Sequence, residues 1–199
     1  MLSTLPAIEE LIAIAHRYYP PIDPQQDQEA YFASPEWQRY CDLWERVMRL
    51  EEMPRWGEFC DALEKVLPDC KLWDTSVPRR DGCRSLRVII VPPDTPPGQP
   101  EYIEVVAQVS FLAPVYFLYE AYSRRKTDGK YTPSEIRYQF SERTAPHARV
   151  LAEHIERYFG CRPLPDEIGR TPVPDIRALG NVPLGQQTLF ELLLTEDIL

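Results

Sequence analysis

An alternating stretch from Tyr102 to Phe111 constrains the fold of this chain more than any other feature. Every second residue is apolar or small, which is the period of a β-strand, and the other set is mixed. The side chains that we expect on the buried face are Ile103, Val105, Val109 and Phe111. The sequence therefore predicts a strand with one buried face.

Further strands are predicted on both sides of this one. The β-branched run 85–91 stops at two prolines, a bend at 113–114 precedes a strand over 115–122, and Ile136, Tyr138 and Phe140 alternate in a fourth. Residues 70–73 add a candidate edge strand. Short connections between consecutive strands favour antiparallel pairing, so we expect an antiparallel sheet of about four strands.

Helical periodicity replaces this pattern toward the N-terminus. Apolar residues recur at helical spacing over 5–15 and stop at Pro20 and Pro21. A second helix is predicted from the N-cap Ser34 to about residue 50. A third helix over 54–66 should turn three residues inward, namely Phe59, Leu63 and Val66.

The C-terminal part combines a helix with a tail rich in proline and glycine. A helix over 145–159 should end at Gly160, and the segment 161–185 holds five prolines and three glycines before a final short helix over 186–194. We therefore predict a single α+β domain over 1–199. It comprises an acidic helical part (1–67), an antiparallel sheet (68–142), and a helix plus a tail that wraps the domain or binds a partner (143–199).

Negative charge is concentrated in the helical part. Residues 23–64 contain eleven acids and four arginines, a net charge of 4 − 11 = −7, within a chain whose net charge is −9. Such a field attracts basic partners and makes nucleic-acid binding an unexpected function. The carboxylates that we predict to bind a partner are Asp42, Glu45, Glu51, Glu52, Glu58 and Asp61.

Catalytic signatures are weak. No G-x-S-x-G, S-x-x-K or phosphate-binding glycine motif occurs, and His147 and His154 have no third ligand at a metal-binding spacing. We therefore predict no metal, no cofactor and no enzymatic activity. The enzymatic alternative is a small metal-dependent hydrolase or nuclease that uses the carboxylates of Asp94, Glu101 and Glu104.

The five cysteines are odd in number, widely spaced and without a C-x-x-C pair. This usage is typical of free thiols in a reducing compartment, with a Cys70–Cys83 disulfide as the alternative. No apolar run approaches the ~20 residues that span a bilayer, and the first residues lack the basic start of a signal peptide. The sequence thus predicts a cytoplasmic protein that does not bind membranes.

The C-terminal residues carry a resemblance. Val173-Pro174-Asp175, Gly180-Asn181, Leu184-Gly185 and Thr188-Leu189-Phe190-Glu191 are similar to the ending of uncharacterised bacterial immunity proteins that are encoded beside polymorphic toxins. The resemblance implies a cytoplasmic inhibitor that occludes the active site of a cognate toxin domain, which we expect to be basic, and it implies no particular site residues. A structural or adaptor subunit of a bacterial assembly is the other alternative.

Overall fold

The structure is a computed structural model that describes residues 4–49, 53–77, 81–90, 101–124, 132, 134–178 and 182–195. The helices are α1 (Ile8–Tyr18), α2 (Gln28–Ala33), α3 (Pro35–Arg49), α4 (Met53–Val66), α5 (Ala145–Phe159), α6 (Asp166–Gly169) and α7 (Leu189–Leu193). The strands are β1 (Lys71–Asp74), β2 (Cys83–Ile90), β3 (Glu101–Ser110), β4 (Val115–Arg124), β5 (Glu135–Arg137) and β6 (Arg162–Pro163). None of the described helices is long and apolar enough to cross a membrane.

One mostly antiparallel sheet organises the chain. Its order is β1-β2-β3-β4-β5, each neighbouring pair is antiparallel, and the two-residue β6 runs parallel to β4. The predicted α+β class and the antiparallel meander are therefore confirmed. The sheet has more strands than the four predicted, because the candidate edge at 70–73 forms β1 and the tail contributes β6.

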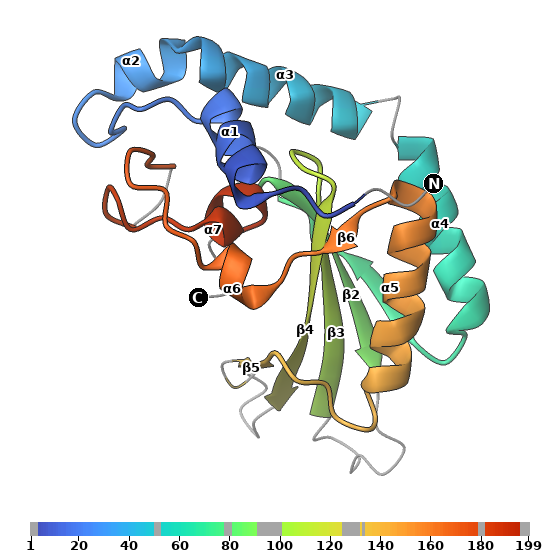
Figure 1. The fold of residues 1–199 in the computed structure, drawn as a ribbon. Coiled ribbons are helices and arrows are strands. Elements are labelled where there is room, and N and C mark those ends of the chain that lie inside the picture. Colours follow the sequence, from blue (N-terminus) through green and yellow to red (C-terminus); the bar gives the residue numbers. More distant parts are fainter. Residues whose placement is uncertain are drawn as a thin grey trace.

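Helices cover both faces of this sheet, as Figure 1 shows. α1, α2, α3 and α7 belong to a first core on one face, whereas α4 and α5 pack in a second core on the other. Val106 faces the first core, and its neighbours Val105 and Ala107 face the second. The prediction that only one face of β3 is buried is therefore wrong, because a sheet sandwiched between helices buries both sets of alternating side chains.

Three of the four residues predicted on the buried face of β3 are buried, namely Ile103, Val105 and Val109. Phe111 is half-buried and packs on the first core instead, where its ring lies 5.9 Å from that of Trp44. The hydroxyl of Ser110 accepts hydrogen bonds from the backbone N–H of Leu112 and of Ala113. This local turn ends the strand at Ser110, so the alternation no longer decides which way Phe111 points.

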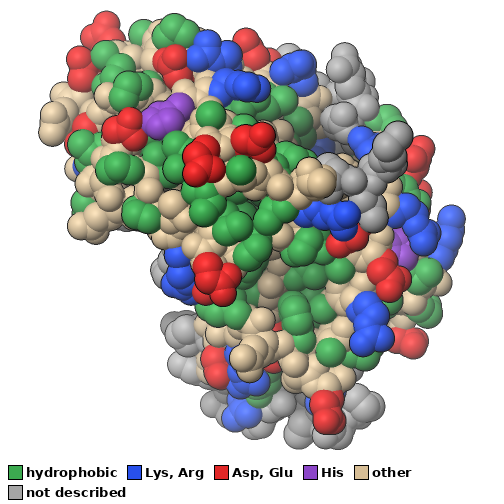
Figure 2. Space-filling model, in the orientation of Figure 1, with side chains coloured by type: hydrophobic (Ala, Val, Ile, Leu, Met, Phe, Trp, Pro, Cys, Tyr) green, Lys and Arg blue, Asp and Glu red, His purple; other side chains and the backbone are tan. Residues whose placement is uncertain are grey.

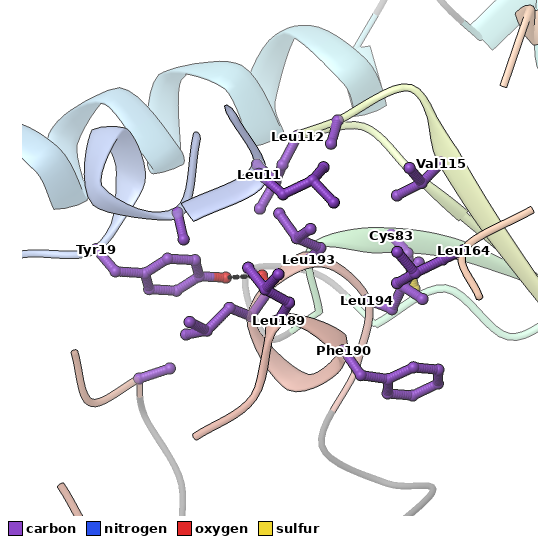
Figure 3. Close-up of a cluster of buried hydrophobic side chains, with 14 of the residues drawn as sticks. Leu11, Tyr19, Cys83, Leu112, Val115, Leu164, Leu189, Phe190, Leu193 and Leu194 are labelled. Carbon is purple, nitrogen blue, oxygen red and sulfur yellow. Dashed lines mark hydrogen bonds between the residues drawn. The ribbon is translucent and has the colours of Figure 1, made fainter. Parts of the chain in front are cut away.

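The tail closes the first core. Residues of α7 are fully or almost fully buried, and the hydroxyl of Tyr19 donates a hydrogen bond of 2.8 Å to the carbonyl of Leu192. In Figure 3, Leu11 of α1 lies beside Leu193 of α7. A capping box between Thr188 and Glu191 starts the helix, which is why it begins at Leu189 and not at residue 186 as predicted.

The second core joins α4 and α5 to the sheet through Phe59, Leu63, Leu151 and Ile155, all with no exposed surface. Val66 was predicted to point inward but is 50% exposed, because Leu67, four residues after Leu63, takes the inward position. α5 ends as predicted at a left-handed glycine, Gly160.

Gly57 lies inside α4, and a Cβ built on it meets no atom within 4 Å. Gly57→Ala is therefore expected to raise the free energy of unfolding by about 0.5–1 kcal/mol, because alanine loses less backbone entropy in a helix. Urea denaturation measures the change. Gly82→Ala is the contrasting variant: its Cβ would lie 2.8 Å from Leu112 Cδ1 and 3.0 Å from the Leu192 carbonyl oxygen, so it should destabilise. If both substitutions raised the free energy of unfolding, or both lowered it, the packing described around these two glycines would be contradicted.

Candidate functional site

The acidic residues predicted to bind a partner are divided between two helices. Asp42 is exposed and Glu45 is half-buried on α3, while Glu58 and Asp61 are exposed on α4. The remaining two, Glu51 and Glu52, lie outside the described residues. α3 packs on the first core and α4 on the second.

Charges of both signs alternate over the face of the molecule drawn in Figure 2. Acidic and basic side chains lie next to one another there, around a central band of hydrophobic side chains. This face therefore presents no extended surface of a single charge. The exposed carboxylates of α3 and α4 are the acidic positions that the sequence singled out and that the structure places in solvent.

Several of the residues that carry the resemblance in the tail make structural contacts, whereas Gly180 and Asn181 lie outside the described residues. The backbone N–H of Val173 donates to the Gln187 carbonyl at 2.7 Å, and Leu189 and Phe190 are buried in the first core. The carboxylate of Glu191 accepts hydrogen bonds from the backbone and hydroxyl of Thr188. These contacts hold the tail on the domain.

Glu104, the centre of the enzymatic alternative, faces the first-core side of β3. Its carboxylate receives a hydrogen bond of 2.7 Å from Arg87 of the neighbouring strand, which pairs with it as a salt bridge. Asp94 and the side chain of Glu101 lie outside the described residues. Within the described ranges, no cluster of three or more histidine, cysteine or acidic side chains is placed to hold a metal ion.

The two α5 histidines contact backbone carbonyl oxygens one helical turn earlier in the chain. Nδ1 of His147 lies 3.0 Å from the Arg143 carbonyl oxygen, and Nδ1 of the buried His154 lies 2.8 Å from that of Val150. Each contact is to the residue four positions earlier, and His154 also stacks on Tyr158. His154 therefore contributes to the packing of α5, while His147 has a local contact to the backbone before the helix.

All five cysteines are free thiols, and the alternative Cys70–Cys83 disulfide is not formed. Burial raises the pKa of both Cys60 and Cys161 to about 11. Because the thiolate is the reactive form, these two thiols are poor nucleophiles at neutral pH.

Sequence reasoning missed a buried carboxylate, Glu120, which is 2% exposed on β4. It accepts hydrogen bonds from the backbone and hydroxyl of Ser141 at 3.0 and 2.8 Å, from the Thr144 hydroxyl, and from Arg137 at 3.4 Å. Burial alone would raise the pKa of Glu120, but the hydrogen bonds from Thr144 and Ser141, aided by Arg137, lower it.

These hydrogen bonds also explain why β5, the strand predicted to contain Ile136, Tyr138 and Phe140, is short. They draw residues 141–144 against β4 to start α5, so β5 ends at Arg137, and Tyr138, expected in the strand, is 42% exposed. The signal in the sequence was an acid at an inward position of a strand.

A pocket of about 340 Å³ lies where α3, α4 and the end of α5 meet the turn between β3 and β4. We call it the helix-junction pocket. Its lining is mainly apolar and comprises Leu43, Val47, Arg55, Trp56, Arg84, Val109, Ser110, Phe111, Leu112, Ala113, Pro114, Phe159 and Cys161. The described lining residues thus contribute two arginines and no acid.

Arg84 is the buried charge of this pocket, at 5% exposure. Its Nη2 donates a hydrogen bond to the Val47 carbonyl, and its guanidinium lies 5.1 Å from the centre of the Trp56 ring. Trp56 is fixed in turn because its indole N–H donates to Asp74 at 2.9 Å. At the other side, the guanidinium of Arg55 lies 5.5 Å from the Phe159 ring centre.

Comparison with protein-family models, with curated proteins and with solved structures finds no match to this chain.

Proposed function

We propose that this protein binds a basic protein partner and neutralises it by covering its active site, as an immunity protein neutralises a toxin. The observation that carries the proposal is the exposure of Asp42, Glu58 and Asp61 on helices whose opposite sides are buried. The resemblance of the C-terminal residues to immunity proteins supports the same class of partner. In this proposal the protein acts by steric occlusion and performs no chemistry.

Rigid attachment of α3 supports this role. Tyr40 and Trp44 are buried, and both donate hydrogen bonds to the Asp81 carbonyl, at 2.9 and 3.1 Å. A helix held in this way keeps Asp42 at a fixed position before a partner arrives. Binding then loses less conformational entropy than it would for a mobile segment.

α4 is held by apolar packing, since Phe59 and Leu63 are buried in the second core. Glu58 and Asp61 of the same helix remain in solvent. Exposed charges of one sign chiefly raise the rate at which an oppositely charged partner is encountered. The net charge of −7 over residues 23–64 supplies a field of the required sign.

The partner is identified by affinity capture from the cells that produce this protein. A basic enzyme of the toxin class, captured in stoichiometric amount and inactive while bound, is the expected result. A captured enzyme that remains fully active would contradict neutralisation, even if the complex were stable. Capture of an acidic partner would contradict the electrostatic argument.

Reversing the charges of Asp42, Glu58 and Asp61 to lysine, one at a time, is expected to slow association with this partner about 2- to 10-fold at low salt. The effect should shrink at high salt, because ions screen exposed charges over a Debye length of ~10 Å at 0.1 M. Stopped-flow or surface-based kinetics at two salt concentrations measure the rates.

Glu153→Lys is the matched control, since Glu153 is exposed on α5 and the substitution changes the net charge by the same amount. If the control slows association as much as the three test variants do, only the total charge matters and the α3 and α4 positions have no special role.

A further inference from the structure

We propose that the outer edge of β1 is an interaction surface for a second copy of this chain, and that two β1 strands pair there antiparallel across a two-fold axis. The two sheets then form one continuous sheet. This proposal does not rest on the proposed function, which uses carboxylates of α3 and α4. It follows from the backbone of β1, its side chains and its ability to pair with itself.

The backbone of β1 has hydrogen-bonding groups that point out of the sheet. Within the described residues its one strand neighbour is β2, which runs antiparallel to it. The N–H of Thr75, just after β1, donates to the Ser85 carbonyl at 2.8 Å, which fixes the phase of the ladder. Because bonding alternates along an antiparallel strand, the N–H and C=O groups of Leu72 and Asp74 point away from β2. Such a row of donors and acceptors is a template for another extended chain.

The side chains of this edge include an exposed tryptophan. Trp73 is 55% exposed, the highest value among the exposed large hydrophobic side chains that the structure describes. Tryptophan contributes strongly to the centre of protein interfaces. The opposite edge of the sheet, β5, presents a salt bridge of 2.9 Å between Glu135 and Arg137, and charged side chains discourage edge pairing. The β1 edge is therefore the better surface for a partner strand.

The sequence of β1 allows it to pair with itself. Outward-pointing backbone groups must lie opposite one another, and centring the pair on Leu72 places Leu72 opposite Leu72 of the second copy. Lys71 of each copy then lies opposite Trp73 of the other, where an ammonium over an indole face is favourable. Both side chains are exposed. Centring on Trp73 instead would place the apolar Leu72 opposite the charged Asp74, so the first register is favoured. A second copy therefore supplies both the backbone and the side chains that this edge lacks.

Sedimentation of the full chain tests the proposal. β1 has four residues, so the contact is smaller than the ~1,200 Å² of stable complexes, and a reversible monomer–dimer equilibrium is expected between about 5 and 500 µM. Each chain has a net charge of −9, so dimerisation should strengthen as salt screens the repulsion between copies. This salt dependence is opposite to that expected for a basic partner, so the two proposals can fail separately. A monomer at every concentration and salt would overturn the edge pairing.

Side-chain variants locate the contact. Trp73→Lys should lower the association constant at least about tenfold, because it removes the indole and places two lysines opposite each other. Tyr138→Lys is the matched control, since Tyr138 follows β5 at the other edge, is 42% exposed, and undergoes the same substitution. The control should dimerise like the unsubstituted protein. Equal losses in the two variants, or a loss in Tyr138→Lys alone, would overturn the assignment to β1.

A backbone variant tests strand pairing itself. Leu72→Pro removes an N–H that points away from β2, so the ladder to β2 should survive while dimerisation is lost. Leu72→Val is the control, because it keeps the N–H and suits a strand. Circular dichroism and urea denaturation confirm that both variants fold, and the Trp73 and Tyr138 variants decide the question even if Leu72→Pro does not. Equal dimerisation of folded Leu72→Pro and Leu72→Val would overturn the pairing of the two strands.

Discussion

Replacing Arg177 with methionine is expected to lower the free energy of unfolding by about 3–5 kcal/mol. Nη1 of Arg177 donates to both carboxylate oxygens of Asp23, at 3.1 and 3.2 Å, and the two side chains are only 9% and 8% exposed. Methionine would leave the Asp23 carboxylate buried without its counter-charge. Chemical denaturation followed by circular dichroism measures the loss.

Arg170→Met is the matched control, because Arg170 also donates from one nitrogen to both oxygens of its partner, Asp166. That pair is half exposed and lies in the same tail, so its loss should cost less than about 1 kcal/mol. Similar costs for the two variants would mean that burial does not strengthen the dependence on Arg177. The Arg177–Asp23 pair joins positions 154 residues apart, so its loss in Arg177→Met should also increase proteolysis of the tail.

Glu120→Ala is expected to destabilise the protein by about 3 kcal/mol or more, because it removes a charged acceptor from several buried donors at once. The hydroxyl of Thr144 and both donors of Ser141 would lose the carboxylate that joins the start of α5 to β4. Glu135→Ala is the control, since Glu135 pairs with the same Arg137 but is 59% exposed, and it should cost less than about 1 kcal/mol. An equally mild effect at Glu120 would contradict its structural role.

The same carboxylate predicts a pH dependence. The pKa of Glu120 is lower in the folded protein than in the unfolded chain. Its stabilisation is therefore complete above the unfolded glutamate pKa of about 4.3, and it is lost as the pH falls through the lower folded value. Denaturation series at several pH values should show a weaker acid dependence in Glu120→Gln than in the unsubstituted protein. Identical curves would show that Glu120 does not titrate in this way.

Local sequence signals predicted the helices well. Ser34 and Pro35 placed the start of α3, where the Trp37 N–H donates to the Ser34 hydroxyl, and Gly160 placed the end of α5. The six-residue α2 and the four-residue α6 were missed because they are too short to show helical periodicity. The cap of α2, Asp27, nevertheless accepts a hydrogen bond from the Ala30 N–H as a cap should.

Tertiary packing decided what these signals missed. Alternation in β3 identified the strand but not the second layer of helices, which buries Val106 as fully as Val105. Glu120 was overlooked because its donors follow it by 21 and 24 positions. Contacts over such distances leave no periodic mark in a single sequence.

The candidate sites also differ in how far the sequence could predict them. Composition and helical spacing predicted that Asp42, Glu58 and Asp61 would be exposed, since charges on an amphipathic helix lie away from its apolar face. The helix-junction pocket joins residues from Leu43 to Cys161, with Arg84 between them. Only the fold brings these positions together, so no sequence motif could have predicted the pocket.

Carboxyl footprinting of the complex with the captured partner tests the proposed function most directly. A carbodiimide couples a neutral amine to exposed carboxylates, and mass spectrometry then compares labelling at each acid in the free and bound protein. Asp42, Glu58 and Asp61 should be protected in the complex, while Glu153 on α5 and Glu167 in the tail should label as in the free protein. Protection of Glu167 with unchanged labelling of the three helix carboxylates would place the interface on the tail and contradict the account.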